Sequence, residues 1–156
     1  MSSSSAGVGK EIPIAEQFHG FLESHFLAML TTLREDGMLS TNPVGYVWDG
    51  ERIRISSLRS RYKCRNIAAD DRVCFCVQSP TNPMDYVEVR GRATLEADPD
   101  RSFFREQFRR GMGGEDPPPD LDPAEAERVI IVIHPEQVSA PKVYGDRFDD
   151  HGKRAK

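Results

Sequence analysis

Residues 52–78 read RIRISSLRSRYKCRNIAADDRVCFCVQ. The first residues alternate, with Ile53 and Ile55 on one face and Arg52 and Arg54 on the other, which predicts a half-buried strand. The segment RYKCRNIAAD predicts a short helix, and the apolar run RVCFCVQ predicts a strand that is buried on both faces. This order of strand, short helix and strand favours a β-rich fold in which helices only interrupt the sheet.

The residues before this segment predict two more strands. We expect them at 26–33 and 38–48, because each is followed by an Asp-Gly pair, which tolerates the positive φ angles of a tight turn. Together with strand 52–57 they form a meander. Apolar residues at helical spacing over 12–24 predict an amphipathic helix that precedes the first strand.

The residues after it predict the last two strands and another helix. Residues 85–97 alternate along a long strand, in which Gly91 marks a bulge. Residues 101–110 predict a helix with Asp98 as its N-cap. A loop rich in Pro and Gly follows, and the apolar residues of 128–138 predict the final strand.

These elements predict one mainly β domain, a small barrel of six strands with a few helices. We expect residues 1–9 to be a disordered segment, 10–138 to form the domain, and 139–156 to be a polar tail. Several strands are apolar on both faces, although a small barrel has only one interior. A second copy of the chain is the simplest cover for the outer faces, so we expect a homodimer.

Composition excludes several classes of protein. A net charge of -4 and a pI near 5.6 argue against a nucleic-acid partner. No stretch approaches the roughly 20 apolar residues that span a bilayer, and the first ten residues do not resemble a signal peptide, so we expect a cytoplasmic protein without a membrane partner. Cys64, Cys74 and Cys76 lack metal-binding spacing, and we expect core thiols and no metal site.

One segment carries an unusual charge. Between residues 52 and 69 there are six basic residues and no acidic one: Arg52, Arg54, Arg59, Arg61, Lys63 and Arg65. Ser56 and Ser57 add hydroxyl donors, and the helix that follows offers free backbone N–H groups at its N-terminus. This combination suits a phosphate or several carboxylates. The alternative interpretation is a solvated basic face.

The order of the motifs resembles that of a known group of proteins. The segments AMLTTLREDGMLSTNPVGYVWDGERIRISS, ISSLRSRYKCRN, DDRVCFCVQ and DYVEVRGRATLEAD resemble the flavin-binding split-barrel superfamily, which includes the pyridoxamine 5'-phosphate oxidases. They are most similar to the branch that uses the deazaflavin coenzyme F-420. The resemblance covers residues 14–138 and implies a six-stranded split β-barrel.

The resemblance also implies a cofactor site. Its residues would be Asn42, Pro43, Val44, Ser56, Ser57, Arg61, Lys63, Asn66, Met84 and Tyr86. Arg61 and Lys63 would hold the phosphate beside the serines, residues 42–44 would lie along the ring system, and Met84 and Tyr86 would come from the partner subunit. Structural alternatives remain, namely a strand break at 42–43, a packed aromatic at Tyr86, and a helix cap or cross-link at Asn66.

The implied chemistry is hydride transfer between coenzyme F-420 and a small unsaturated molecule, with the cofactor carrying the reaction. The alternatives are an FMN-binding oxidase or reductase and a non-catalytic flavin- or F-420-binding protein. The six basic residues suit the polyanionic tail of F-420 better than the single phosphate of FMN. The sequence identifies neither a catalytic residue nor the substrate.

Overall fold

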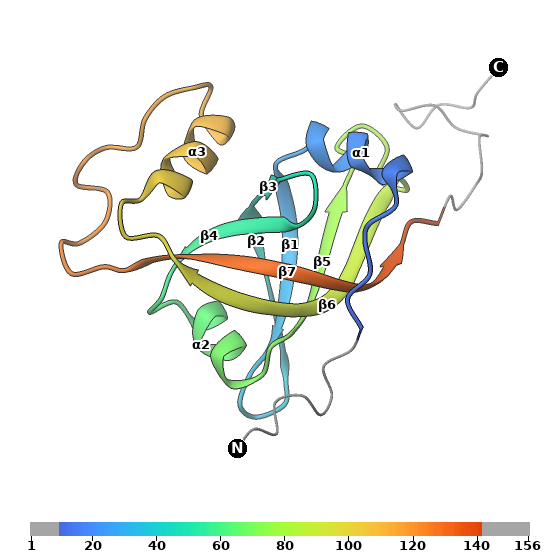
Figure 1. Ribbon diagram of the computed structural model, residues 1–156, viewed down its shortest axis with the longest axis horizontal. Coiled ribbons are helices and arrows are strands. Elements are labelled where there is room, and N and C mark those ends of the chain that lie inside the picture. The colour runs from blue at the N-terminus through green and yellow to red at the C-terminus, as the bar shows by residue number, and fades with distance from the viewer. Residues whose placement is uncertain (1–9, 142–156) are drawn as a thin grey trace.

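The computed structural model describes residues 10–141, which form one antiparallel sheet with short helices around it (Figure 1). The strands are β1 (Leu27–Leu33), β2 (Leu39–Gly45), β3 (Val47–Trp48), β4 (Ile53–Leu58), β5 (Arg72–Gln78), β6 (Tyr86–Ala97) and β7 (Arg128–Ser139). The helices are η2 (Glu16–Phe18, a 3-10 turn), α1 (His19–Ser24), α2 (Tyr62–Ala69) and α3 (Ser102–Gly111). The expected disordered segment 1–9, and the expected tail from residue 142 onward, lie outside the described residues.

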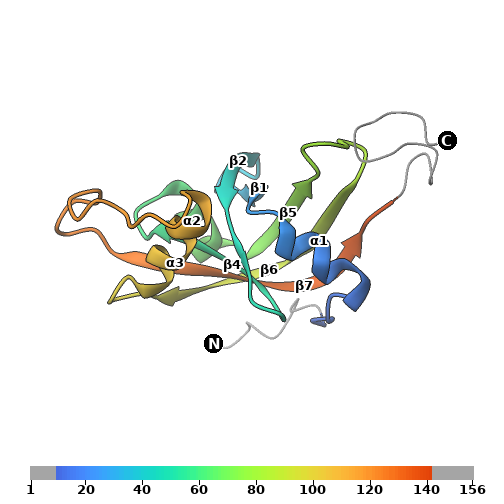
Figure 2. The same ribbon diagram turned by 90° about the horizontal axis from the view of Figure 1, so that it is seen from above.

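The mainly β prediction is confirmed, but residues 10–141 contain seven strands, not six. The expected strand 38–48 is divided at Tyr46 into β2, which pairs with β1, and β3, which pairs with β4. Since the sheet order is β2-β1-β5-β6-β7-β4-β3, these consecutive strands lie at its two opposite edges. The chain therefore crosses from one edge to the other within a single residue, and the sheet curls into a half-barrel (Figure 2).

Tyr46 stabilises this crossing. Its side chain is completely buried, and its hydroxyl donates a hydrogen bond of 2.7 Å to the carbonyl oxygen of Leu22 in α1. Its backbone N–H donates to the carbonyl oxygen of Phe26 at 3.0 Å. Burying a tyrosine in this way requires that its hydroxyl be bonded, and α1 supplies the acceptor.

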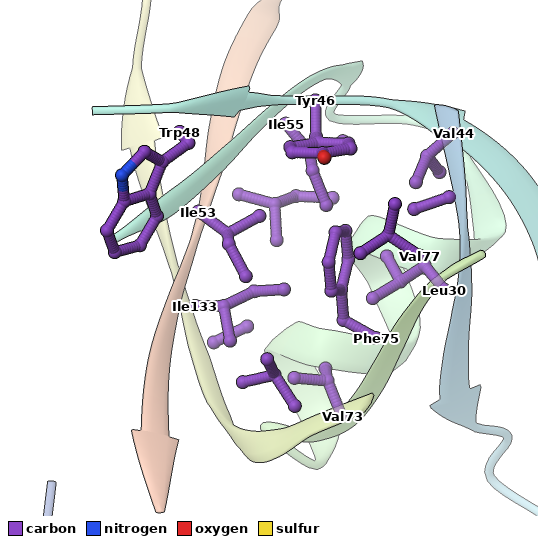
Figure 3. Close-up of a cluster of buried hydrophobic side chains, with 14 of the residues drawn as sticks. Leu30, Val44, Tyr46, Trp48, Ile53, Ile55, Val73, Phe75, Val77 and Ile133 are labelled. Carbon is purple, nitrogen blue, oxygen red and sulfur yellow. The ribbon is translucent and has the colours of Figure 1, made fainter. Parts of the chain in front are cut away.

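The inward faces of the strands form a single core (Figure 3). Burial alternates along β4 with a period of two, as the sequence predicts. It also alternates along β5, so the expectation that this strand is buried on both faces is wrong for the single chain. Phe75 of β5 meets the ring of Tyr46 edge-on at a centroid distance of 5.0 Å. Cys74 and Cys76 lie on the opposite face of β5 and are only half-buried, so the prediction that they are core thiols is wrong; Cys64 of α2 is buried.

Most turn predictions are confirmed. Gly37 and Gly50, the glycines of the two Asp-Gly pairs, have φ values of 83° and 95°. The register between β6 and β7 shifts at Arg90 and Gly91, where a Cβ on the glycine would overlap the carbonyl oxygen of His134. The bulge therefore requires glycine at this position.

The beginning of α3 differs from the expectation. The N-cap residue is Arg101, in a left-handed conformation with a φ of 59°, and not Asp98. Asp98 nevertheless serves the same end of the helix, because its carboxylate accepts hydrogen bonds from the backbone N–H groups of Phe103 (3.3 Å) and Phe104 (3.0 Å). The chain makes an additional turn between the capping carboxylate and the helix.

Candidate functional site

The half-barrel leaves a seam between β2 and β4. β3 pairs with only Ile53 and Arg54, so the rest of β4 runs beside β2 without hydrogen bonds between the two strands. A cavity of about 200 Å³ lies in this seam. It is lined by Pro43, Val44, Gly45, Ser56, Ser57, Leu58, Arg61, Lys63 and Arg128. The fold thus brings together six of the ten residues predicted for the cofactor site.

Arg61 and Lys63 give the cavity a positive charge. They lie at the N-terminus of α2, which has no side-chain cap and is therefore open to an anion. Neither residue belongs to any ion pair within residues 10–141. Burial, and secondarily the charge of Arg61, lower the pKa of Lys63. Both effects disfavour an ammonium that has no anion beside it.

This lowered pKa predicts a pH dependence. An anion needs Lys63 in its charged form, whose population falls as pH rises through the lowered pKa. Anion affinity should therefore decline at a pH below the value of about 10.4 at which an ordinary lysine titrates. Titration of FMN between neutral and alkaline pH measures this decline, and Lys63→Arg, which stays charged, should lack it. Identical pH profiles for the wild type and Lys63→Arg would contradict the assignment.

Asn42 lies next to this cavity on β2 and has an unsatisfied acceptor. Its side-chain oxygen, Oδ1, is buried and has no hydrogen-bond partner among residues 10–141. Such a group costs free energy unless a partner supplies a donor. The pyrimidine edge of a flavin or deazaflavin carries an N–H group, so Asn42 fits the edge of that ring.

The other predicted site residues lie elsewhere. Asn66 is buried in α2, and its Nδ2 donates a 3.0 Å hydrogen bond to the hydroxyl of Thr32 in β1, so it cross-links the helix to the sheet. Met84 and Tyr86 lie at the hairpin between β5 and β6 and do not line the cavity. Their contribution from a partner subunit stays a prediction.

The basic run of residues 52–65 does not form one continuous cluster in the structure. Strand alternation directs Arg54 to the outer face of β4, and Arg52 lies directly before this strand. Each of the two meets carboxylates. Arg52 pairs with Glu11 at 2.7 Å, and Arg54 pairs with Asp49 at 2.6 Å and Glu96 at 3.1 Å. Arg59 pairs with Glu127 at 3.1 Å. The charges of these three arginines are therefore compensated within the chain.

Two residues at the seam were not predicted. Gln107 of α3 accepts a 2.8 Å hydrogen bond from the backbone N–H of Ser56 and packs against Gly45, so it bridges the unpaired edges of β2 and β4. Arg128 lines the cavity from the first position of β7. In the sequence, Arg128 stands out as the one charged residue directly before the apolar run VIIVI. Nothing in the sequence around Gln107 indicates its role.

A larger cleft of about 760 Å³ lies between α1, the β3–β4 hairpin and α3, but none of the predicted site residues lines it. Both of its arginines pair with carboxylates, Arg110 with Glu23 at 3.6 Å and Arg54 with Asp49 at 2.6 Å. Within residues 10–141 there is no group of His, Cys, Asp and Glu side chains suited to a metal ion. No helix in the same range is long and apolar enough to cross a membrane.

Comparison with known proteins identifies similar chains. A family model described as pyridoxamine 5'-phosphate oxidase matches residues 14–141. A solved F420 reductase is 35% identical with a TM-score of 0.71, over 81% of this chain and 98% of that one. A putative pyridoxamine 5'-phosphate oxidase from Listeria innocua is 22% identical with a TM-score of 0.62, over 81% and 97% of the two chains.

The same fold also occurs in a heme-binding protein from Mycobacterium smegmatis, at 16% identity and a TM-score of 0.61, over 86% of this chain and 57% of that one. No curated protein matches the chain. At these identities, the Listeria and Mycobacterium proteins show the fold alone.

Proposed function

The chain belongs to the pyridoxamine 5'-phosphate oxidase family of flavin-binding split barrels, and on this premise we propose that it is an oxidoreductase that uses coenzyme F-420. The observation that carries the proposal is the seam cavity, which gathers Ser56, Ser57, Arg61 and Lys63 around an anion-sized space. When bound, the deazaflavin supplies hydride transfer to or from a small unsaturated molecule.

The chain's own residues bind and orient the cofactor in this proposal. The cavity of about 200 Å³ is smaller than the roughly 300–1,000 Å³ of sites that enclose a small molecule. It therefore takes the phosphate, held by Arg61 and Lys63, and the ring lies outside it along residues 42–44. Asn42 accepts a hydrogen bond from the N–H group of the ring, which satisfies its buried oxygen.

A second copy of the chain completes the site in this proposal. Pro43 is exposed and lies directly opposite Met29 in the β1–β2 ladder, so the surface beside the cavity continues onto the outer face of β1. That face is apolar and uncovered in the single chain, with Leu27 60% and Met29 43% exposed. A partner seated there covers the ring, and it also brings its own Met84 and Tyr86 to the cofactor.

FMN is the second candidate cofactor. Arg61 and Lys63 are the two uncompensated charges of the cavity, and a phosphate monoester carries up to about two negative charges. The sequence suggests that a basic surface binds the polyanionic tail of F-420. Because Arg52, Arg54 and Arg59 are already paired with carboxylates, this surface no longer favours F-420 over FMN. Preference for F-420 therefore rests on the 35% identity to the F420 reductase.

Titration of the purified protein with each cofactor tests the proposal. We expect F-420 to bind more tightly than FMN. We also expect reduced F-420, when bound to the protein, to be oxidised as it transfers a hydride to an unsaturated acceptor. The absorbance spectrum of the protein as purified gives an independent readout, because the visible absorption bands of oxidised FMN and oxidised F-420 lie at different wavelengths. Tighter binding of FMN than of F-420 would contradict the proposal and identify FMN as the cofactor.

A further inference from the structure

We infer that Arg128 is an additional anion-binding residue of the seam cavity, and that Asp122 and Phe104 are positioning residues that fix its guanidinium. This inference rests on the proposed cofactor site. It assigns a role to the loop between α3 and β7, which carries Asp122.

The guanidinium of Arg128 is held on two sides. Its Nε donates to Asp122 Oδ2 at 2.7 Å, and its Nη2 donates to Asp122 Oδ1 at 2.8 Å, which makes a bidentate pair. The ring of Phe104 lies against the guanidinium, with 3.6 Å between its centroid and the Cζ of Arg128. The side chain of Asp122 is 4% exposed and that of Arg128 is 11% exposed, so solvent scarcely weakens the pair.

These contacts leave one nitrogen of Arg128, Nη1, without a carboxylate partner. An arginine has five N–H donors, and the bonds to Asp122 come from Nε and Nη2. The protein contact of Nη1 is with the hydroxyl of Ser56 at 3.5 Å, the long limit of a hydrogen bond. Because Arg128 lines the same cavity as Arg61 and Lys63, its Nη1 presents N–H groups to an anion there.

Asp122 fixes the direction of the Arg128 guanidinium and offsets its charge. Its carboxylate is charged at neutral pH, since the hydrogen bonds from Arg128 and the charge of Arg101 keep its pKa below the usual range. It offsets the charge of Arg128, so the net positive charge of the cavity comes from Arg61 and Lys63. Arg128 therefore contributes a directed hydrogen bond more than a further unit of charge.

The double variant Arg128→Met/Asp122→Asn tests this role. It leaves the net charge unchanged and removes both members of the buried pair together, because a buried charge left without its partner is strongly destabilising. Arg101, which also lies 3.6 Å from Asp122, is 31% exposed and stays solvated in the variant. Titrations with FMN and with riboflavin, which lacks the phosphate, isolate the phosphate contact. We expect FMN to bind about tenfold more weakly or worse, as for a lost charge-assisted hydrogen bond, with riboflavin affinity unchanged.

Arg59→Met/Glu127→Gln is the matched control. It removes another arginine–carboxylate pair near the same loop, but neither residue lines the cavity. We expect this variant to bind both ligands as the wild type does. An unchanged ratio of FMN to riboflavin affinity in Arg128→Met/Asp122→Asn would overturn the inference, even if the proposed cofactor binds.

Inorganic phosphate separates this inference from the proposed function. Its effect on the melting temperature of the protein can be measured without F-420 or FMN. If phosphate stabilises the wild type and the control variant but not Arg128→Met/Asp122→Asn, the inference holds even where neither F-420 nor FMN binds, and only the proposed function fails. Equal stabilisation of all three proteins by phosphate would overturn the inference.

Discussion

Replacement of both Arg61 and Lys63 by alanine is expected to weaken binding of F-420 or FMN by about 10²- to 10⁴-fold. Each residue lines the seam cavity and lacks a carboxylate partner within residues 10–141, so each is free to make a charge-assisted hydrogen bond to the phosphate. Such a bond contributes about 1.5–3 kcal/mol. Fluorescence titration of the double variant and the wild type measures the difference.

A control must separate direct contact from the general electrostatic field. Arg59→Ala/Arg65→Ala also removes two positive charges from the same region, but neither side chain lines the cavity. We expect it to change affinity little at 0.1 M salt, where screening acts over roughly 10 Å. If the two double variants lose affinity equally, the residues act through their field alone and the phosphate assignment is wrong. Riboflavin binding should be unchanged in both variants.

The sequence predicts the strands well because their signals are local. Alternation of Ile and Arg in β4 identifies its buried face, and the Asp-Gly pairs locate two turns, since these patterns depend only on neighbouring residues. The division of 38–48 at Tyr46 has no local signal. It results from closure of the sheet, in which one segment pairs with β1 and then with β4, and this depends on strands far apart in the chain.

The same distinction applies to the site. Arg61 and Lys63 could be predicted because a short helix follows a strand in the sequence, and this places them at the helix N-terminus. The ion pairs that compensate Arg52, Arg54 and Arg59 could not be predicted. Their partners Glu11, Glu96 and Glu127 are far away in the sequence and approach the arginines only after folding. Arg128 and Asp122 were missed for the same reason, since the carboxylate that fixes the arginine lies in an irregular loop.

Met29→Glu is expected to convert a homodimer into a monomer and to remove cofactor binding with it. Met29 is at the centre of the exposed face of β1, opposite Pro43 on one side and Cys76 on the other. In a symmetric interface the substitution buries two carboxylates without partners, each at a cost of several kcal/mol, so dimer affinity should fall by about 10³-fold or more. The fold itself should persist because Met29 is 43% exposed in the single chain.

Sedimentation velocity at micromolar concentration and cofactor titration of the same samples measure both effects. Met112→Glu is the matched control, because Met112 is similarly exposed, at 57%, but directly follows α3 and belongs to neither β1 nor β2. It should remain dimeric and bind the cofactor. A wild type that sediments as a monomer would contradict the dimer, whereas a monomeric Met29→Glu that still binds F-420 or FMN at wild-type affinity would show that one chain suffices. Joint loss of the dimer and of cofactor binding is the expected result, because in the proposed site the ring lies on the surface that the partner would cover.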